Sequence, residues 1–468
     1  MENWIIRKES RAVCFDLSEG IDLPMKTTKR MRRQLMELPE EIVFHILSRL
    51  PVSSLCCIRC VSKALLHIVD DHFFISLHTA RLTTVTNPVA DDHHQVPRLM
   101  FFARPSNRSE GFLALQSLKY DGTTGTLTKG KYAVRVSSSD QSERAVYHVH
   151  FVYCNLFFLK DGLHQDCFLL NPLRGGEVLR LPRSPITQHS NFACGDWYGI
   201  GFDSTANTHK ILHVTWNRQV AEVLVLGTRS WREISSVPPL GLNNKRHVCA
   251  YGDMHWLIDG SIGSNYKMKL YEHYEGTSHI LSFDFKKEEF YQIPHPTLHS
   301  SAKHPHYFHL LTLRGSMAIL DASLSRPGGM NMSISIWVLK DYENKQWTLD
   351  YTMEIEKLET QPEFGFMYAS CGEWEHGIFY KEGFARNTTL FLDLRRNDAN
   401  RVIRQRECDG YTNIFSYTQS LISLKDYASA GSEELVTEGL KSYGNLIEGE
   451  EQGFSISEKQ MLRGSSFI

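Results

Sequence analysis

The sequence predicts an α+β multidomain protein in which a short three-helix module precedes an all-β propeller of about six four-stranded blades. Two Leu-Pro pairs enclose a short amphipathic segment near the start of the 468-residue chain. Most of the remaining chain repeats a strand–turn–strand unit roughly every 55 residues. The predicted parts are a flexible basic leader at residues 1–34, the helical module at 35–82, the propeller at 98–424, and a flexible tail at 425–468.

The first helix is expected between the two prolines of ELPEEIVFHILSRLP, which runs from Glu37 to Pro51. Proline suits the first position of a helix because its missing N–H would be unpaired there, and the second proline ends the helix. Two glutamates in the first turn favour the helix dipole. One apolar face follows from the spacing of Ile42, Ile46, Leu47 and Leu50.

Helical spacing continues after Pro51, with Ser53 and Ser54 as candidate N-caps. We expect three short helices from Pro39 to about Arg81. Some ~45 residues in three helices bury little surface, yet this segment has more large apolar side chains than one small core needs. An exposed apolar patch of this kind marks a partner surface; the alternative is that the segment docks on the following domain.

The repeat is clearest in AEVLVLGTRSWREISSVPP, HILSFDFKKEEFYQIPHP and ISIWVLKDYENKQWTLDYTMEI, which begin at Ala221, His279 and Ile334. Each is an alternating strand, a polar turn, a large apolar anchor and a second strand. Segments starting at Leu115, Cys167 and Thr389 fit the same template. The successive anchors are Leu127, Val178, Trp231, Phe290, Trp347 and Val402, with spacings of 51, 53, 59, 57 and 55 residues.

A second class of hairpin lies between these units, in segments starting at Phe151, Tyr198, Cys249, Leu311 and Cys371. Each period therefore holds four strands, which is the pattern of a β-propeller. Six blades fit the count, and seven remain possible. The segment from Tyr411 to Leu424 is expected to return to the first blade and close the ring. The rival fold is a pair of β-sandwiches.

Composition limits the possible partners. The formal net charge of −2 gives no global basic field, so nucleic acid is not expected as a partner. No apolar run reaches the ~18 residues that span a bilayer. The start lacks a secretory signal, and the ten cysteines form no disulfide framework, so cytoplasm or nucleus is expected. The basic run Lys26–Arg33 is a nuclear-import signal, a contact for an acidic partner, or a solvated leader.

A search for chemistry finds no convergent catalytic or metal-binding group. The densest cluster is a set of five histidines, which fits a polar loop between blades better than a metal site: His295, His299, His304, His306 and His309. The tryptophans at repeated blade positions are expected to pack within the fold. We therefore predict no catalytic residue, no metal and no cofactor, and the sequence leaves the substrate-binding residues unknown.

The segment LPEEIVFHILSRLPVSSLCCIRCVSKALL, Leu38 to Leu66, resembles the F-box. The resemblance rests on both Leu-Pro pairs, the Ile-x-x-x-Ile-Leu helix, the Val-Ser-Lys string and a trailing phenylalanine. It implies that the module binds the Skp-type adaptor of a cullin-based ubiquitin ligase, and through it cullin and a RING protein. Carried over by position, the adaptor face or the core beneath it comprises Leu38, Pro39, Ile42, Ile46, Leu47, Leu50, Pro51, Leu55, Val61 and Leu65.

Four of these positions carry specific expectations. Leu65 stands where the F-box commonly has a tryptophan, and loss of an aromatic anchor weakens a contact. Ile46, Leu47 and Leu50 are expected to face the partner protein.

Strings between Phe168 and Leu424 resemble, in order, the F-box-associated interaction domain of plant F-box proteins: FLLNPLRGGEVLRLP, YGIGFDSTANTHKIL, LGTRSWREI, GDMHWLID, ILSFDFKKEEFYQIP, ISIWVLKDYENKQWTL and YTQSLISL. This resemblance implies a kelch-like propeller that holds a ubiquitylation target. Loops of one rim are the expected target contacts, including those near His299–His306, Leu240–His247 and Ser325–Met330.

Three functional hypotheses follow. The first is a non-enzymatic substrate-recognition subunit of a Skp-cullin-F-box ubiquitin ligase. The second is a propeller enzyme or ligand-binding module with a helical docking arm. The third is an adaptor-bound scaffold without ligase activity. The sequence favours the first, because no residue of the chain need perform chemistry when the target is held close to the reactive thioester.

Overall fold

The structure is a computed structural model of the whole chain. It describes the following residues: 38–83, 98–103, 112–121, 126–129, 132–135, 147–161, 166–172, 177–186, 196–215, 220–238, 247–258, 279–296, 306–324, 332–355, 370–374, 377–381, 388–394, 402–406, 413–428 and 435–436. The expected leader at 1–34 and most of the expected tail lie outside these residues.

The helical module contains four described helices, not the three expected. They are α3 (Glu40–Leu47), α4 (Val52–Arg59), α5 (Lys63–Val69) and α6 (His72–Thr83). The sequence analysis missed the break at Asp70–Asp71, where the Asp71 carboxylate accepts a hydrogen bond from Phe74 N at 3.0 Å and starts a new helix. Pro51 directly precedes α4, so Ser53 and Ser54 lie inside the helix and are not its caps.

The helices pack around a small apolar core that includes Val43, Leu47, Leu55, Val69 and Phe74. Polar contacts join α6 to the end of α3: the His78 ring donates to Leu50 O at 3.1 Å, and Arg81 donates to Ser48 Oγ at 2.8 Å. None of the described helices is long and apolar enough to span a bilayer.

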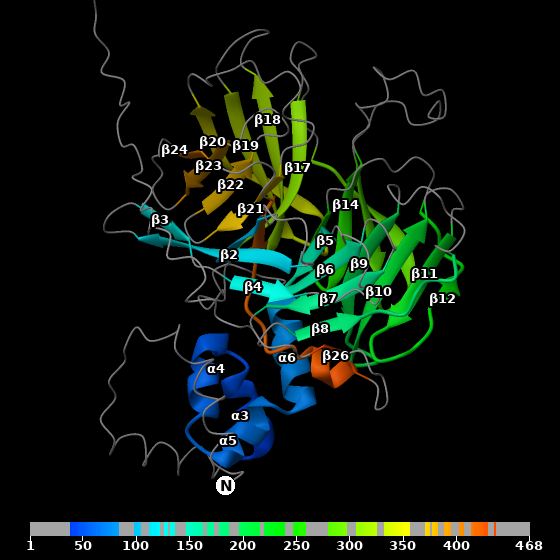
Figure 1. The fold of residues 1–468 in the computed structure, drawn as a ribbon. Coiled ribbons are helices and arrows are strands. Elements are labelled where there is room, and N and C mark those ends of the chain that lie inside the picture. The colour runs from blue at the N-terminus through cyan, green and yellow to red at the C-terminus, as the bar shows by residue number, and fades with distance from the viewer. Residues whose placement is uncertain are drawn as a thin grey trace, which may run out of the picture.

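The strands form five antiparallel blades of four consecutive strands each (Figure 1). The first two blades are β5 (Tyr147–Tyr153), β6 (Leu156–Asp161), β7 (Cys167–Asn171), β8 (Glu177–Arg180) and β9 (Trp197–Asp203), β10 (Thr208–Thr215), β11 (Val220–Val225), β12 (Arg232–Ile234). The next two are β13 (His247–Ala250), β14 (Asp253–Ile258), β15 (His279–Asp284), β16 (Glu289–Pro294) and β17 (His306–Leu313), β18 (Ser316–Leu324), β19 (Met332–Asp341), β20 (Gln346–Ile355). The fifth is β21 (Ser370–Trp374), β22 (Gly377–Lys381), β23 (Thr388–Asp393), β24 (Val402–Arg406).

A further sheet of the described strands joins the two ends of the propeller. It holds β1 (Arg98–Ala103), β2 (Phe112–Asp121), β3 (Thr126–Lys129), β4 (Tyr132–Arg135) and β25 (Asn413–Tyr417). β25 pairs with β1 over the register Arg98↔Tyr417 to Phe102↔Asn413, so the predicted closure of the ring by Tyr411–Leu424 is confirmed.

The ring is continuous through its innermost strands. β5 contacts β9, β9 contacts β14, β13 contacts β17, β17 contacts β21, β21 contacts β25, and β25 contacts β5. The predicted all-β propeller is therefore confirmed. The expectation of about six four-stranded blades is wrong in number, because five blades are built from four consecutive strands. The remaining sheet, which closes the ring, is assembled from distant parts of the chain.

The predicted anchors lie on or beside the fourth strand of each unit, as the repeat requires. Trp231 immediately precedes β12, and its indole N–H donates to Pro182 O of the preceding blade at 2.7 Å. Trp347 in β20 makes the same contact with Pro294 O at 3.0 Å. Trp256 is buried and stacks on Trp197 at 5.8 Å. The prediction that these tryptophans pack within the fold is confirmed.

Two of the inner hairpins turn through two-residue loops with both residues at positive φ. Tyr251 and Gly252 have φ of 57° and 87°, and Arg314 and Gly315 have φ of 51° and 77°. Such loops match the twist of antiparallel strands. The second of these turns is held by the next blade, because Arg314 N donates to the carboxyl group of Glu373 at 2.8 Å. Burial raises the pKa of Glu373 to about 8.

We expect Glu373→Gln to make the protein more stable than the wild type at pH 8 but not at pH 5. The pKa of Glu373 is about 8 in the folded protein, and its ordinary value is 4.5. Between these two pH values the folded chain keeps a proton on Glu373 that the unfolded chain has lost. The contribution of Glu373 to the free energy of unfolding is fully present below pH 4.5 and is lost as the pH rises towards 8. Thermal unfolding at both pH values measures the effect, on the order of several kcal/mol; parallel pH profiles of variant and wild type would contradict it.

Candidate functional site

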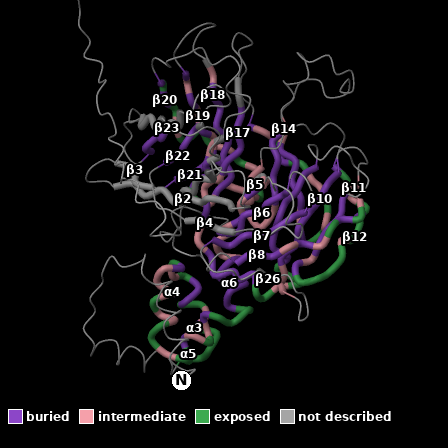
Figure 2. The backbone as a smooth tube through the Cα atoms, viewed as in Figure 1, coloured by how far each residue is buried: buried purple, intermediate pink, exposed green. Residues whose placement is uncertain are grey.

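The helical module carries most of the large apolar side chains exposed among the described residues. Two others, Val237 and Leu349, lie on the propeller. Those on the module are Leu38, Ile42, Ile46, Val61 and Phe73. Ile42 and Ile46 are four residues apart in α3, so they share one face of the helix, and Leu38 lies two residues before the helix begins. Figure 2 shows this exposed module beside the mostly buried strands of the propeller.

The predicted adaptor-binding residues divide into a surface and a core. Ile42 is 46% exposed and Ile46 is 42% exposed. Leu38, Pro39, Pro51 and Val61 are also exposed, and Leu50 is half-buried. This surface is called the α3 face below, and it comprises Leu38, Ile42 and Ile46.

The remaining three predicted residues lie beneath the surface. Leu47 is 1% exposed, and Leu55 and Leu65 are also buried in the helical core. The expectation that Leu47 faces a partner is wrong for this chain, because its side chain points into the module. Leu65 fills this core, so the replacement of the usual tryptophan changes the packing under the surface and not the surface itself.

One residue of the propeller completes the helical core. Leu421, which follows β25, is buried in the same cluster as Val43, Leu47 and Phe74. The module is therefore joined to the propeller by an apolar contact in addition to the chain connection. Figure 1 shows the segment after β25 passing between the blue helices and the strands of the ring.

That segment, Thr418–Tyr427, is called the closing segment below. It crosses the blade β5–β8 and is hydrogen-bonded to polar side chains within it. Thr418 N donates to Cys154 O at 3.2 Å, and Ser420 Oγ donates to Asn155 Oδ1. Asn155 Nδ2 donates to Asn171 Oδ1 at 3.0 Å, and Asn171 Nδ2 donates to Ile422 O at 2.7 Å.

Glu177 in β8 holds the next part of the closing segment. Its carboxylate accepts from Leu424 N at 2.7 Å and from Ser423 Oγ at 3.2 Å and 3.3 Å. Leu424 begins the short 3-10 helix η6 (Leu424–Tyr427). All three groups are buried, so water does not replace these bonds when they are lost. Ordered structure thus extends past Leu424, where the flexible tail was expected to begin.

Tyr427 at the end of η6 bridges the helices and the second blade. Its hydroxyl lies 2.7 Å from Nδ1 of His209 in β10, and its ring lies 6.5 Å from that of His72 in α6. Burial lowers the pKa of His209 to about 3, so its imidazole is neutral at physiological pH. The closing segment is therefore fixed at both ends, with the helical module packed on its middle.

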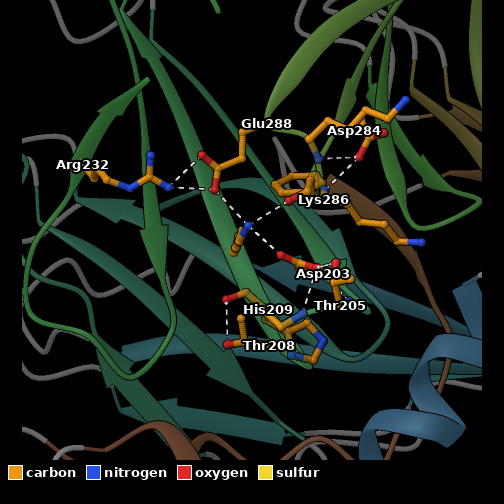
Figure 3. Close-up of polar contacts among 12 residues, drawn as sticks. Asp203, Thr205, Thr208, His209, Arg232, Asp284, Lys286 and Glu288 are labelled. Atoms are coloured by element: carbon orange, nitrogen blue, oxygen red, sulfur yellow. Dashed lines mark hydrogen bonds and ion pairs between the residues drawn. The ribbon is translucent and has the colours of Figure 1, made fainter. Parts of the chain in front are cut away.

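An ion-pair network next to His209 joins the second and third blades (Figure 3). Lys210 lies 2.7 Å from Asp203 and 2.9 Å from Glu288, and Glu288 also accepts two bonds from Arg232 at 2.7 Å. Burial alone would raise the pKa of Asp203, but hydrogen bonds from Lys210 and Thr205 lower it to about 2. Asp203 also caps its own turn by accepting hydrogen bonds from Thr205 N and Ala206 N.

A buried charge cluster lies between the first and second blades. Lys160 Nζ is 3.2 Å from both Asp196 and Tyr198 OH, and His213 Nδ1 is 2.6 Å from Glu222. Burial alone would lower the pKa of His213, but the carboxylates of Asp196 and Glu222 raise it. Because these opposite charges are paired with one another, the cluster fits a structural role between the blades.

Sequence reasoning missed the closing segment as a functional element. Asn155, Asn171 and Glu177 are polar residues at the ends of apolar strands, and this was the available signal. Of the histidine cluster, His309 is buried and packs edge-on against Tyr380 at 5.4 Å. No group of three or more possible metal ligands occurs within the described residues. The three loops proposed as target contacts lie almost entirely outside that part of the chain.

The structure thus combines a helical module that exposes an apolar face with a propeller against which the module packs. Comparison with known proteins gives the family. The model of the F-box domain matches residues 35–77, and that of the F-box associated beta propeller domain matches residues 70–409. The chain therefore belongs to the F-box proteins with an F-box-associated β-propeller domain.

The curated relatives agree with this assignment. Two putative F-box proteins of Arabidopsis thaliana are each 23% identical, covering 70% and 78% of this chain and 76% and 86% of their own length. An F-box/LRR-repeat/kelch-repeat protein of the same plant is 24% identical over 58% of this chain and 75% of its own. Among solved structures, the WD40 domain of SCAP from fission yeast is similar over 69% of this chain and 73% of its own, at 10% identity and a TM-score of 0.30.

Proposed function

We propose that this protein is the substrate-recognition subunit of a Skp-cullin-F-box ubiquitin ligase. The F-box binds the Skp-type adaptor, the adaptor connects it to cullin and a RING protein, and the propeller binds the protein to be ubiquitylated. The α3 face carries this proposal. It exposes Ile42 and Ile46 on α3 and Leu38 just before that helix, all within the F-box, and exposed apolar surfaces of this kind are partner sites.

The propeller supports the second half of the proposal because the helical module packs against it. Leu421 and Tyr427 fix the helices against the ring, so a target held by the propeller keeps a constant position relative to the adaptor. Ubiquitin transfer then depends on a high effective concentration of the target near the thioester. In this account the chain is not an enzyme, because the ubiquitin-conjugating enzyme provides the reactive group. The location of the protein in the cytoplasm or the nucleus stays a prediction.

Reconstitution tests the proposal directly. The full-length chain is mixed with a Skp-type adaptor, cullin, RING protein, the ubiquitin-activating and ubiquitin-conjugating enzymes, and proteins captured on the chain from proteasome-inhibited cells. We expect a stable complex and ubiquitin conjugates on a captured protein that depend on the chain. Failure to bind the adaptor would overturn the proposal. Adaptor binding without cullin binding or conjugates would identify a scaffold and overturn the ligase role.

A further inference from the structure

The outer edge of the blade β5–β8 is covered by another strand of the same chain. β26 (Leu435–Val436) pairs with β8 in antiparallel orientation, with Leu435 opposite Leu179 and Val436 opposite Val178. The corresponding outer strands β12, β16, β20 and β24 end their sheets in the part of the chain that the structure describes. The edge of β8 therefore accepts an extended segment, whereas its equivalents in the other four regular blades carry no described strand.

The edge of β8 favours a pairing strand that has two adjacent apolar residues. Val178 and Leu179 are both buried, and they belong to two different hydrophobic clusters, one on each face of the sheet. Residues directly opposite in an antiparallel pair lie on the same face and interact. A strand added at this edge consequently meets an apolar surface at both positions.

The two ends of the edge differ in charge. Arg180 lies at one end, and it and Arg183 bind the carboxylate of Asp166 at 2.7 Å and 2.6 Å. Two guanidinium groups around one carboxylate give this end a positive charge. Glu177 lies at the other end, where its carboxylate holds the closing segment. An acidic residue is therefore favoured next to Arg180 and disfavoured next to Glu177.

The chain's own sequence has this pattern. A strand that continues the observed register by one residue in each direction places the residue before the apolar pair opposite Arg180 and the residue after it opposite Glu177. The sequence around β26 is Glu433-Glu434-Leu435-Val436-Thr437. The acidic residues come before the pair and a neutral residue follows it. Within the part of the chain that the structure describes, β26 pairs with two of the four residues of β8, and an incoming strand that pairs with all four continues the same ladder.

We propose that the outer edge of β8 is a docking site for a short extended peptide with an acidic residue directly before two apolar residues. Main-chain pairing supplies affinity and the flanking charges supply direction, as in other cases of strand addition. Leu435–Val436 occupies the edge in cis and competes with the incoming peptide. This inference rests on the proposed function, in which the peptide belongs to the ubiquitylation target.

Fluorescence polarisation with the full-length chain tests the inference. The probe is a labelled peptide of sequence SEELVT, identical to Ser432–Thr437. The chain is compared with a variant carrying Leu435→Asp and Val436→Asp, which removes the cis competitor. The matched control carries Phe454→Asp and Ile456→Asp, which change two apolar residues further along the chain. A tethered segment has an effective concentration of about millimolar, so we expect the first variant to bind the probe at least ~5-fold more tightly than wild type and control do.

The charge requirement is tested on the peptide, where no folding defect can arise. Replacing both glutamates of the probe by lysine (SKKLVT) is expected to weaken binding to the first variant at least ~5-fold, because lysine meets Arg180. Equal affinities of all three chains for SEELVT, no binding to the first variant, or equal binding of SKKLVT would overturn the inference. Adaptor binding by the same preparations separates this failure from that of the proposed function, since adaptor binding does not involve β8.

Discussion

Replacing both Ile42 and Ile46 by glutamate is expected to lower the affinity for the Skp-type adaptor at least ~100-fold while leaving the fold intact. Burying one such side chain at an interface stabilises it by about 1.5–3 kcal/mol, and 1.4 kcal/mol corresponds to a factor of ten. Both side chains are exposed in the free chain, so the charges cost little in the unbound state. Isothermal titration calorimetry and thermal unfolding measure the two quantities.

The matched control for this variant is a chain with Val237→Glu and Leu349→Glu. Among the described residues, these are the two exposed large apolar side chains that lie on the propeller and not on the helices. The control is expected to bind the adaptor as the wild type does. Equal losses in both variants would show a general effect of surface charge, and an undiminished affinity of the α3-face variant would refute the assigned surface.

Glu177→Ala is expected to destabilise the protein by on the order of 3 kcal/mol, because hydrogen bonds to a charged acceptor contribute about 1.5–3 kcal/mol each. The change leaves Leu424 N and Ser423 Oγ without their acceptor in a buried place. Release of the closing segment also loosens the pairing of β25 with β1 and the contact of Leu421 with the helices. Denaturant unfolding measures the loss of free energy.

A graded series distinguishes this mechanism from a general effect of removing a charge. Glu177→Gln keeps an acceptor for Leu424 N and is expected to lose less stability than Glu177→Ala. Glu354→Ala removes an exposed glutamate from β20 and is expected to change stability little. In Glu177→Ala, proteolysis is expected to become faster at the closing segment. Equal stability of the two Glu177 variants and the wild type would contradict the role of this carboxylate.

The repeat made most of the propeller predictable. Anchors such as Trp231 and Trp347 recur because each blade must pack on the preceding one, and their indoles repeat the same bond to a proline carbonyl. The ends of the ring were harder to predict, because β25 and β1 are joined by pairing between residues more than 300 positions apart. Periodicity identifies the strands within a blade, but it does not by itself show which distant strand pairs with β1.

The helical module shows a second limit of sequence reasoning. The spacing of Ile42, Ile46 and Leu47 correctly predicted an apolar face, but it did not show which residues are exposed. One helical position separates Ile46 from the buried Leu47, and the core that covers Leu47 includes Leu421 from the far end of the chain. The polar contacts of Asn171 and Glu177 with the closing segment are equally non-local, and a motif search does not reveal them.

Hydrogen exchange of the full-length chain with and without the Skp-type adaptor tests the central claim most directly. The claim is that the α3 face binds the adaptor while the propeller remains available to a target. We predict slower exchange in α3 and α4 on adaptor binding, with exchange in the outer strands β12, β16 and β20 unchanged. Protection confined to the propeller, or none in α3 and α4 at saturating adaptor, would contradict the claim.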